Sequence, residues 1–171
     1  IIMKEMRLNQ IDAIFVDFDG VLTDNSVITS SLGKEYVVCS RSDGIAANYL
    51  RKIKKPIFIV SSEKNNVVKF RAKKMKISCF QGISDKKEFV TKFCKKKSFD
   101  LSRILFVGND INDFQVMKIS GLSACPADSH KKIQDISGIV LKNNGGNGIL
   151  RELLEEIFNI DLLKEMYIKQ L

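Results

Sequence analysis

The alternation of short apolar runs with longer helical patterns is the feature that most constrains the fold of this chain. Apolar runs typical of buried strands occupy residues 11–16, 56–60, 103–107, 122–125 and 139–141. Helical periodicity connects them over residues 44–53, 64–75, 86–96, 112–119 and 149–158. This alternation predicts an α/β fold, a Rossmann-like doubly wound parallel sheet wrapped by helices through right-handed crossovers.

The length of the chain favours one domain. With 171 residues, of which 44% are hydrophobic, the chain is long enough for one sizeable core and too short for two ordinary catalytic domains. We therefore expect a single domain over residues 1–171. Between residues 25 and 40 the pattern changes to two short β-type segments around a turn at residues 31–34. This predicts a β-hairpin inserted after the first strand, too small to form a cap domain.

Composition excludes several classes of function. The net charge of +8 comes largely from lysine clusters at residues 73–76 and 95–97, which fall at the ends of predicted helices, where lysine is favoured. No aromatic residues interleave with these lysines, so no nucleic-acid partner is expected. The four cysteines form no Cys-x-x-Cys pair, and no apolar stretch approaches a membrane span. These features predict a cytoplasmic protein with reduced thiols.

Two carboxylates follow the first predicted strand. Asp17 and Asp19, in the segment Asp-Phe-Asp-Gly, are separated by one residue and would repel each other without a cation between them. A hard divalent cation such as Mg²⁺ accepts a few carboxylate oxygens together with water and substrate phosphate. The pattern indicates a magnesium-assisted phosphoryl transfer in which Asp17 is the nucleophile and Asp19 supplies and recovers a proton.

A second polar cluster follows the third predicted strand. Asn109, Asp110 and Asp113 stand in the segment Gly-Asn-Asp-Ile-Asn-Asp, which fits either a helix N-cap or the second half of a metal site. Ser61 follows another strand and is expected to open a helix, where its hydroxyl would act as an N-cap or hold a phosphate oxygen. Lys86 opens a further helix and would reach the same phosphate as a point charge. The carboxyl ends of parallel strands should bring all of these together.

In order along the chain, these segments resemble the four motifs of the haloacid dehalogenase superfamily. Residues 17–24 resemble the first motif, Ser61 the second, Lys86 the third, and residues 108–113 the fourth. The ordered set is far more specific than any one motif. Nearly the whole chain is covered by the resemblance.

The resemblance implies a role for each matched residue. Asp17 would form an aspartyl-phosphate, and Asp19 would be the general acid and base. The Asp17 side chain, the Asp19 backbone carbonyl and the fourth motif would hold Mg²⁺, while Ser61 and Lys86 would bind the phosphoryl group. Asp113 would support this arrangement. The usual metal ligand after the motif's glycine is aspartate, whereas this chain has Asn109, so either the Asn109 amide or Asp110 would contact the metal.

Within the superfamily, the chain resembles the capless sugar-acid phosphatases. The marks are the hairpin, Ser42-Asp43-Gly44, the segment 81–86 and the glycine-rich segment 145–152. The resemblance implies a homotetramer in which the hairpins form a central barrel and neighbouring copies complete each active site. It also implies a small sugar-acid phosphate as substrate.

The substrate and the role of the domain stay open between three alternatives. Glu63 and Lys74 resemble the specificity residues of the phosphatases that act on sialic-acid type nonulosonate 9-phosphates, which is the reading we favour. The second alternative is a 3-deoxy-manno-octulosonate 8-phosphate phosphatase. The third is a weakly active or non-catalytic oligomerisation domain of a CMP-N-acylneuraminate synthetase, fused to or working with its cytidylyltransferase. The chain begins with Ile1, which fits an excised domain and equally a trimmed start.

Overall fold

The computed structural model describes residues 7–168, whose centre is a six-stranded parallel sheet. Its strands, in the spatial order β5-β4-β1-β6-β7-β8, are Ser78–Phe80, Ile57–Val60, Ala13–Val16, Ile104–Val107, Leu122–Cys125 and Ile139–Val140. β1 lies between β4 and β6 and is entirely buried, which explains its unbroken apolar sequence. The predicted α/β architecture with a parallel sheet is confirmed.

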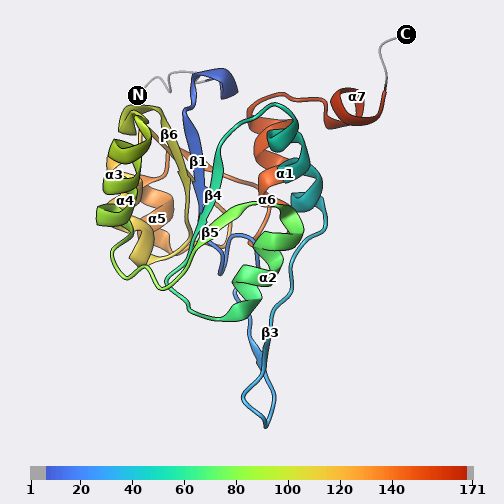
Figure 1. Ribbon diagram of the computed structural model, residues 1–171, viewed down its shortest axis with the longest axis vertical. Helices are drawn as coiled ribbons and strands as arrows, with labels where there is room; N and C mark the ends of the chain where they lie inside the picture. Colours follow the sequence, from blue (N-terminus) through green and yellow to red (C-terminus); the bar gives the residue numbers. More distant parts are fainter. Residues whose placement is uncertain (1–6, 169–171) are drawn as a thin grey trace.

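Helices cover both faces of this sheet (Figure 1). One face carries α1 (Ser42–Lys52), α2 (Asn66–Met75) and α6 (Ile149–Glu152), and α6 continues as one π-helical turn, Leu153–Ile157. The other face carries α3 (Lys86–Lys97), α4 (Phe114–Ile119) and α5 (Lys131–Ile136). The last helix, α7 (Leu162–Tyr167), contacts α1. None of the helices in residues 7–168 has the length and apolar character that crossing a membrane requires.

The side chains of β1 alternate between two hydrophobic cores. Ile14 and Val16 point to the core under α1, α2 and α6, whereas Ala13 and Phe15 point to the core under α3, α4 and α5. Phe15 packs there within a group of aromatic rings and makes an edge-on contact with Phe93 at 5.9 Å between ring centroids. Burial of both faces fixes the register of the strand, and with it the point where the chain leaves the sheet at Asp17.

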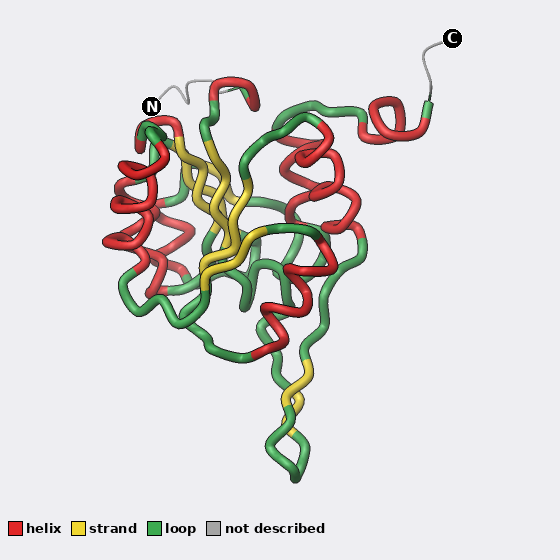
Figure 2. Tube along the Cα trace, in the orientation of Figure 1, coloured by secondary structure: helices red, strands yellow, loops and turns green. Residues whose placement is uncertain are grey.

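The hairpin inserted after β1 is the part that extends furthest from the sheet (Figure 2). Its strands β2 (Ile28–Thr29) and β3 (Glu35–Tyr36) are antiparallel and shorter than the predicted segments. It projects from the end of the molecule at which β1 terminates, and so stands beside the polar residues that follow the strands.

Several predicted elements need correction. The helix expected directly after Ser61 begins only at Asn66, where the Asn65 side chain accepts a hydrogen bond from the backbone of Val67. The helix expected from residue 112 begins at Phe114, after a 3₁₀ turn. β5, α5 and α7 were not predicted, because each is only three to six residues long and its pattern is too short to recognise.

Candidate active site

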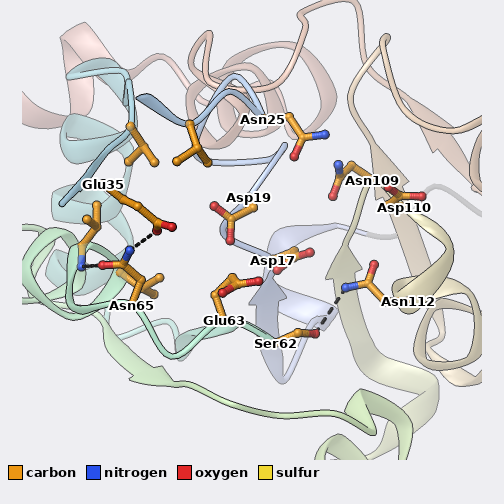
Figure 3. A pocket seen from close by; sticks show the side chains of 14 residues that line it. Asp17, Asp19, Asn25, Glu35, Ser62, Glu63, Asn65, Asn109, Asp110 and Asn112 are labelled. Atoms are coloured by element: carbon orange, nitrogen blue, oxygen red, sulfur yellow. Dashed lines mark hydrogen bonds between the residues drawn. The ribbon is translucent and has the colours of Figure 1, made fainter. Parts of the chain in front are cut away.

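The carboxyl ends of β1, β4 and β6 meet at one pocket of about 300 Å³ (Figure 3). The chain leaves β1 at Asp17, β4 at Ser61 and β6 at Gly108. The side chains around the pocket that matter most here are Asp17, Asp19, Glu35, Glu63, Asn109 and Asp110. The topology of the sheet therefore brings together polar residues that are far apart in the sequence, such as Asp17 and Asp110.

Lys86 links two buried carboxylates beneath the pocket. Its Nζ lies 2.8 Å from Asp17 Oδ2 and 2.7 Å from Asp113 Oδ1, and all three side chains are almost fully buried. Burial alone would lower the pKa of Lys86, but the two carboxylates outweigh it and raise this pKa above its ordinary value. A buried lysine that stays charged between two acids can also balance the charge of a bound phosphoryl group.

Two hydrogen bonds hold the backbone and the side chain of Asp17 in place. Its backbone N–H donates to Val107 O at 2.9 Å, and its Oδ1 accepts a hydrogen bond from the N–H of Phe18 at 2.7 Å. Burial and the nearby Asp113 raise the pKa of Asp17, while Lys86 acts in the opposite direction. The energetic cost of this buried charge falls when a cation is bound beside it.

Asp19 is the second carboxylate of the pocket and is half-buried. Burial raises its pKa, Glu63 and Glu35 raise it further, and Lys86 lowers it. An acid that holds its proton more tightly than usual is suited to protonate a leaving oxygen. The chain turns sharply after it at Gly20, which has φ +75°, and the N–H of Gly20 donates to Thr23 Oγ1 at 3.1 Å.

Asn109 presents an unpaired oxygen to this site. The side chain is 7% exposed, and its Oδ1 has no hydrogen-bond partner among residues 7–168. The backbone N–H of Asn109 donates to Asp113 Oδ2 at 2.9 Å, which fixes the start of the loop. Asp110 lines the same pocket, and its Oδ1 accepts a hydrogen bond from the N–H of Ile111 at 2.7 Å.

The donor set fits a hard cation such as Mg²⁺. No cluster of three or more His, Cys, Asp or Glu ligands forms in the part of the chain that the structure describes. The candidate donors are instead the Asp17 carboxylate, the orphaned Asn109 amide oxygen, the Asp110 carboxylate and the backbone carbonyl of Asp19. All are oxygen atoms, and Mg²⁺ takes one or two carboxylates together with water and phosphate oxygens.

Besides Lys86 and Asp113, which lie beneath the pocket, two more of the predicted site residues, Ser61 and Lys74, lie outside its lining. Ser61 is fully buried, and its hydroxyl accepts the N–H of Glu63 at 3.1 Å, so it shapes the loop after β4 and does not cap a helix. The neighbouring Ser62 lines the pocket instead. Glu63 also lines it, but Lys74 is exposed in the last turn of α2, at the opposite end of that helix from Asn65. Within one chain, Glu63 and Lys74 are therefore not brought together.

The hairpin contributes pocket residues that were not predicted from the sequence. Glu35 of β3 lines the pocket and accepts a hydrogen bond from the side-chain amide of Asn65, at the start of α2. Asn25, at the base of the hairpin, lines it too. No local pattern marks these residues, because their place depends on how the hairpin packs beside the start of α2.

Comparison with known proteins agrees with this geometry. Residues 2–153 match the haloacid dehalogenase-like hydrolase family. The 3-deoxy-D-manno-octulosonate 8-phosphate phosphatase of Escherichia coli K12 is 26% identical over 150 residues, which are 87% of this chain and 80% of that protein. A haloacid dehalogenase family hydrolase of Streptomyces avermitilis superposes with a TM-score of 0.88 and 34% identity, over 92% of this chain and 96% of that one.

A second similar structure carries ligands. The 3-deoxy-D-manno-octulosonate 8-phosphate phosphatase of Moraxella catarrhalis, solved with a magnesium ion, a phosphate ion and a KDO molecule, has a TM-score of 0.83 and 26% identity. The match covers 92% of this chain and 88% of that one. This chain belongs to the haloacid dehalogenase-like hydrolase family. Within that family it is a phosphatase, similar to the sugar-acid phosphatases.

Proposed function

We propose that the chain is a magnesium-dependent phosphatase that hydrolyses the phosphate ester of an eight- or nine-carbon sugar acid in the cytoplasm. The observation that carries this proposal is the buried contact between Asp17, Lys86 and Asp113, placed under a pocket that Asp19 and Asn109 also line. One site then holds a nucleophile in Asp17, a proton donor in Asp19 and a buried ammonium group in Lys86. It also holds a set of oxygen donors for a metal.

The reaction proceeds in two steps in this proposal. The Asp17 carboxylate attacks the phosphorus, the bond between phosphorus and the sugar oxygen breaks, and Asp19 gives that oxygen its proton. Asp19 then takes a proton from water, which attacks the phosphorus of the aspartyl-phosphate and releases inorganic phosphate. Both aspartates return to their starting states. The raised pKa of Asp19 supports its role as the acid of the first step.

The other residues position and balance charge. Lys86 offsets negative charge on Asp17 and on the phosphoryl group, and Asp113 holds Lys86 and the Asn109 backbone in place. Ser61 acts through the loop after β4, whose Ser62 faces the pocket. Mg²⁺ bound by Asp17, the Asp19 carbonyl and Asn109 or Asp110 would neutralise charge on the phosphoryl oxygens.

A sialic-acid type nonulosonate 9-phosphate is our first candidate substrate, because Glu63, which resembles a specificity residue of the phosphatases that act on such substrates, lines the pocket. A 3-deoxy-manno-octulosonate 8-phosphate is the second, supported by the relatives from Escherichia coli and Moraxella catarrhalis. The remaining pocket residues are mainly carboxylates and amides, groups that hydrogen-bond sugar hydroxyls well.

The hairpin favours a further candidate role, assembly. Val27, Ile28, Leu32, Tyr36 and Val38 are all more than half exposed, so the hairpin offers an apolar surface that no other part of residues 7–168 covers. A homotetramer built through this surface is part of the proposal. A domain with negligible turnover that assembles a cytidylyltransferase is the alternative that the same surface supports.

The test of the proposed function is phosphate release in the presence of Mg²⁺. The substrates are N-acetylneuraminate 9-phosphate, the deaminated nonulosonate 9-phosphate and 3-deoxy-manno-octulosonate 8-phosphate, with the Asp17→Asn variant as the blank. Turnover of one sugar-acid phosphate that disappears in the blank supports the phosphatase and identifies its substrate. A folded tetramer that releases no phosphate from any of the three would support the assembly role instead.

A further inference from the structure

The side-chain oxygen of Asn109 is buried and has no hydrogen-bond partner among residues 7–168. An unpaired polar atom in a buried position destabilises a fold, so a ligand that pairs with it has an energetic advantage. Gly20 leaves room for this amide, since a Cβ at residue 20 would lie 1.9 Å from Asn109 Nδ2. Figure 3 shows Asn109 with Asp17, Asp19 and Asp110 around the same pocket.

The buried donors offer a cation little net charge. Asn109 is neutral, and the Asp17 carboxylate shares its Oδ2 with the Lys86 ammonium at 2.8 Å. Asp110 and Glu63 also line the pocket, but both are exposed, so water and salt screen their charges more strongly. The buried groups therefore dominate the affinity for a metal that binds alone.

The pocket is equally unfavourable for a phosphate group that binds alone. The buried Asp17 and the half-buried Asp19 line it, and no lysine or arginine of residues 7–168 does, because Lys86 lies beneath. A dianion entering this pocket meets negative charge until a cation is present. Since linkage is reciprocal, a metal that strengthens phosphate binding is itself bound more tightly once phosphate is in place.

We propose that Asn109 keeps the Mg²⁺ affinity of the empty site low, so that the metal and the phosphoryl group bind as a coupled pair. The inference rests on the proposed magnesium-dependent function and adds to it an order of binding. An aspartate at this position would add a buried negative charge next to the cation and let the metal bind first. The identity of residue 109 thus determines whether the resting protein holds a metal.

Isothermal titration calorimetry tests this with MgCl₂ alone and with MgCl₂ in the presence of saturating inorganic phosphate. For the wild type, we expect phosphate to tighten Mg²⁺ binding about tenfold or more, within the usual range of coupling between two ligands. Asn109→Asp should bind Mg²⁺ alone at least about tenfold more tightly than the wild type. Circular dichroism shows whether each variant is folded.

Asn112→Asp is the matched control, because Asn112 lines the same pocket but is exposed and donates to Ser62 Oγ at 3.3 Å. It adds the same charge away from the buried donors, and we expect a change in Mg²⁺ affinity of less than about threefold. Equal effects of the two substitutions would overturn the inference, and so would tight Mg²⁺ binding by the phosphate-free wild type. Absence of turnover with coupled binding intact would contradict the proposed function alone.

Discussion

Among single residues, Asp43 is a buried carboxylate that lies outside the pocket. It lies in the first turn of α1, and its Oδ1 accepts the N–H of Leu150 at 2.8 Å, which ties α1 to the start of α6. Its other oxygen is buried without a hydrogen-bond partner among residues 7–168, as is Nε of Arg71. Burial raises the pKa of Asp43 to about 6, although the backbone hydrogen bonds and Arg71 lower it.

This pKa predicts a dependence of stability on pH. The folded value of about 6 exceeds the ordinary 3.8, so between these values the folded protein holds the proton more tightly than the unfolded chain. The stabilisation that this tighter proton binding gives the fold amounts to roughly 3 kcal/mol. It is complete below pH 3.8 and is lost as the pH rises through about 6. Urea unfolding between pH 4 and 7 should show a decline in stability that is smaller by roughly 3 kcal/mol in Asp43→Asn than in the wild type, because the raised pKa values of Asp17 and Asp19 contribute to the decline in both proteins. Parallel curves would refute the role of Asp43.

At the scale of elements, the loop after β8 closes against the loop after β1. The N–H of Gly146 donates to Val21 O at 3.0 Å, and a Cβ at Gly145 would lie 2.2 Å from Gly20 O. The added Cβ is fixed to the backbone of Gly145, and the oxygen it would meet belongs to the backbone of Gly20. The clash could therefore be relieved only by moving one of the two backbone segments. The packing of these two loops therefore supports the turn that carries Asp19.

Gly145→Ala is expected to displace that turn. The added methyl group should destabilise the fold by about 1–3 kcal/mol and lower kcat on the order of 10-fold to 100-fold, since small misplacements of catalytic groups are costly. Gly44→Ala is the control, because Gly44 lies in α1 with nothing within 4 Å of the added Cβ, and alanine favours a helix by about 0.5–1 kcal/mol. Chemical denaturation and steady-state kinetics measure both, and equal behaviour of the variants would contradict the expectation.

Some strands of the sheet could be predicted from the sequence, and others could not. β1, β4 and β6 were predictable because burial on both faces demands continuous apolar residues, and the polar residues after them converge as parallel topology requires. The short β5 has one aromatic residue and one cysteine after a lysine-rich helix end, which gives no period. The meeting of Glu35 with Asn65 depends on a tertiary path that no local pattern encodes.

For the whole molecule, the hairpin predicts self-association. Ile28 is 64% exposed and Leu32 is 82% exposed on a hairpin that projects from the sheet, an arrangement that favours burial between copies. We expect light scattering after size exclusion to give a tetramer for the wild type and a smaller species for Ile28→Lys. Leu163→Lys, in the exposed part of α7, should leave the assembly intact. A monomeric wild type would show that the hairpin serves another purpose.

The covalent role of Asp17 is the central claim, and borohydride trapping tests it most directly. Hydride reduces an acyl phosphate to the primary alcohol with loss of phosphate, so an aspartyl-phosphate formed during turnover becomes homoserine at that position. We predict, by peptide mass spectrometry, homoserine at residue 17 when substrate, Mg²⁺ and borohydride are all present, and none when substrate is omitted. Phosphate release with residue 17 unmodified throughout would contradict the account.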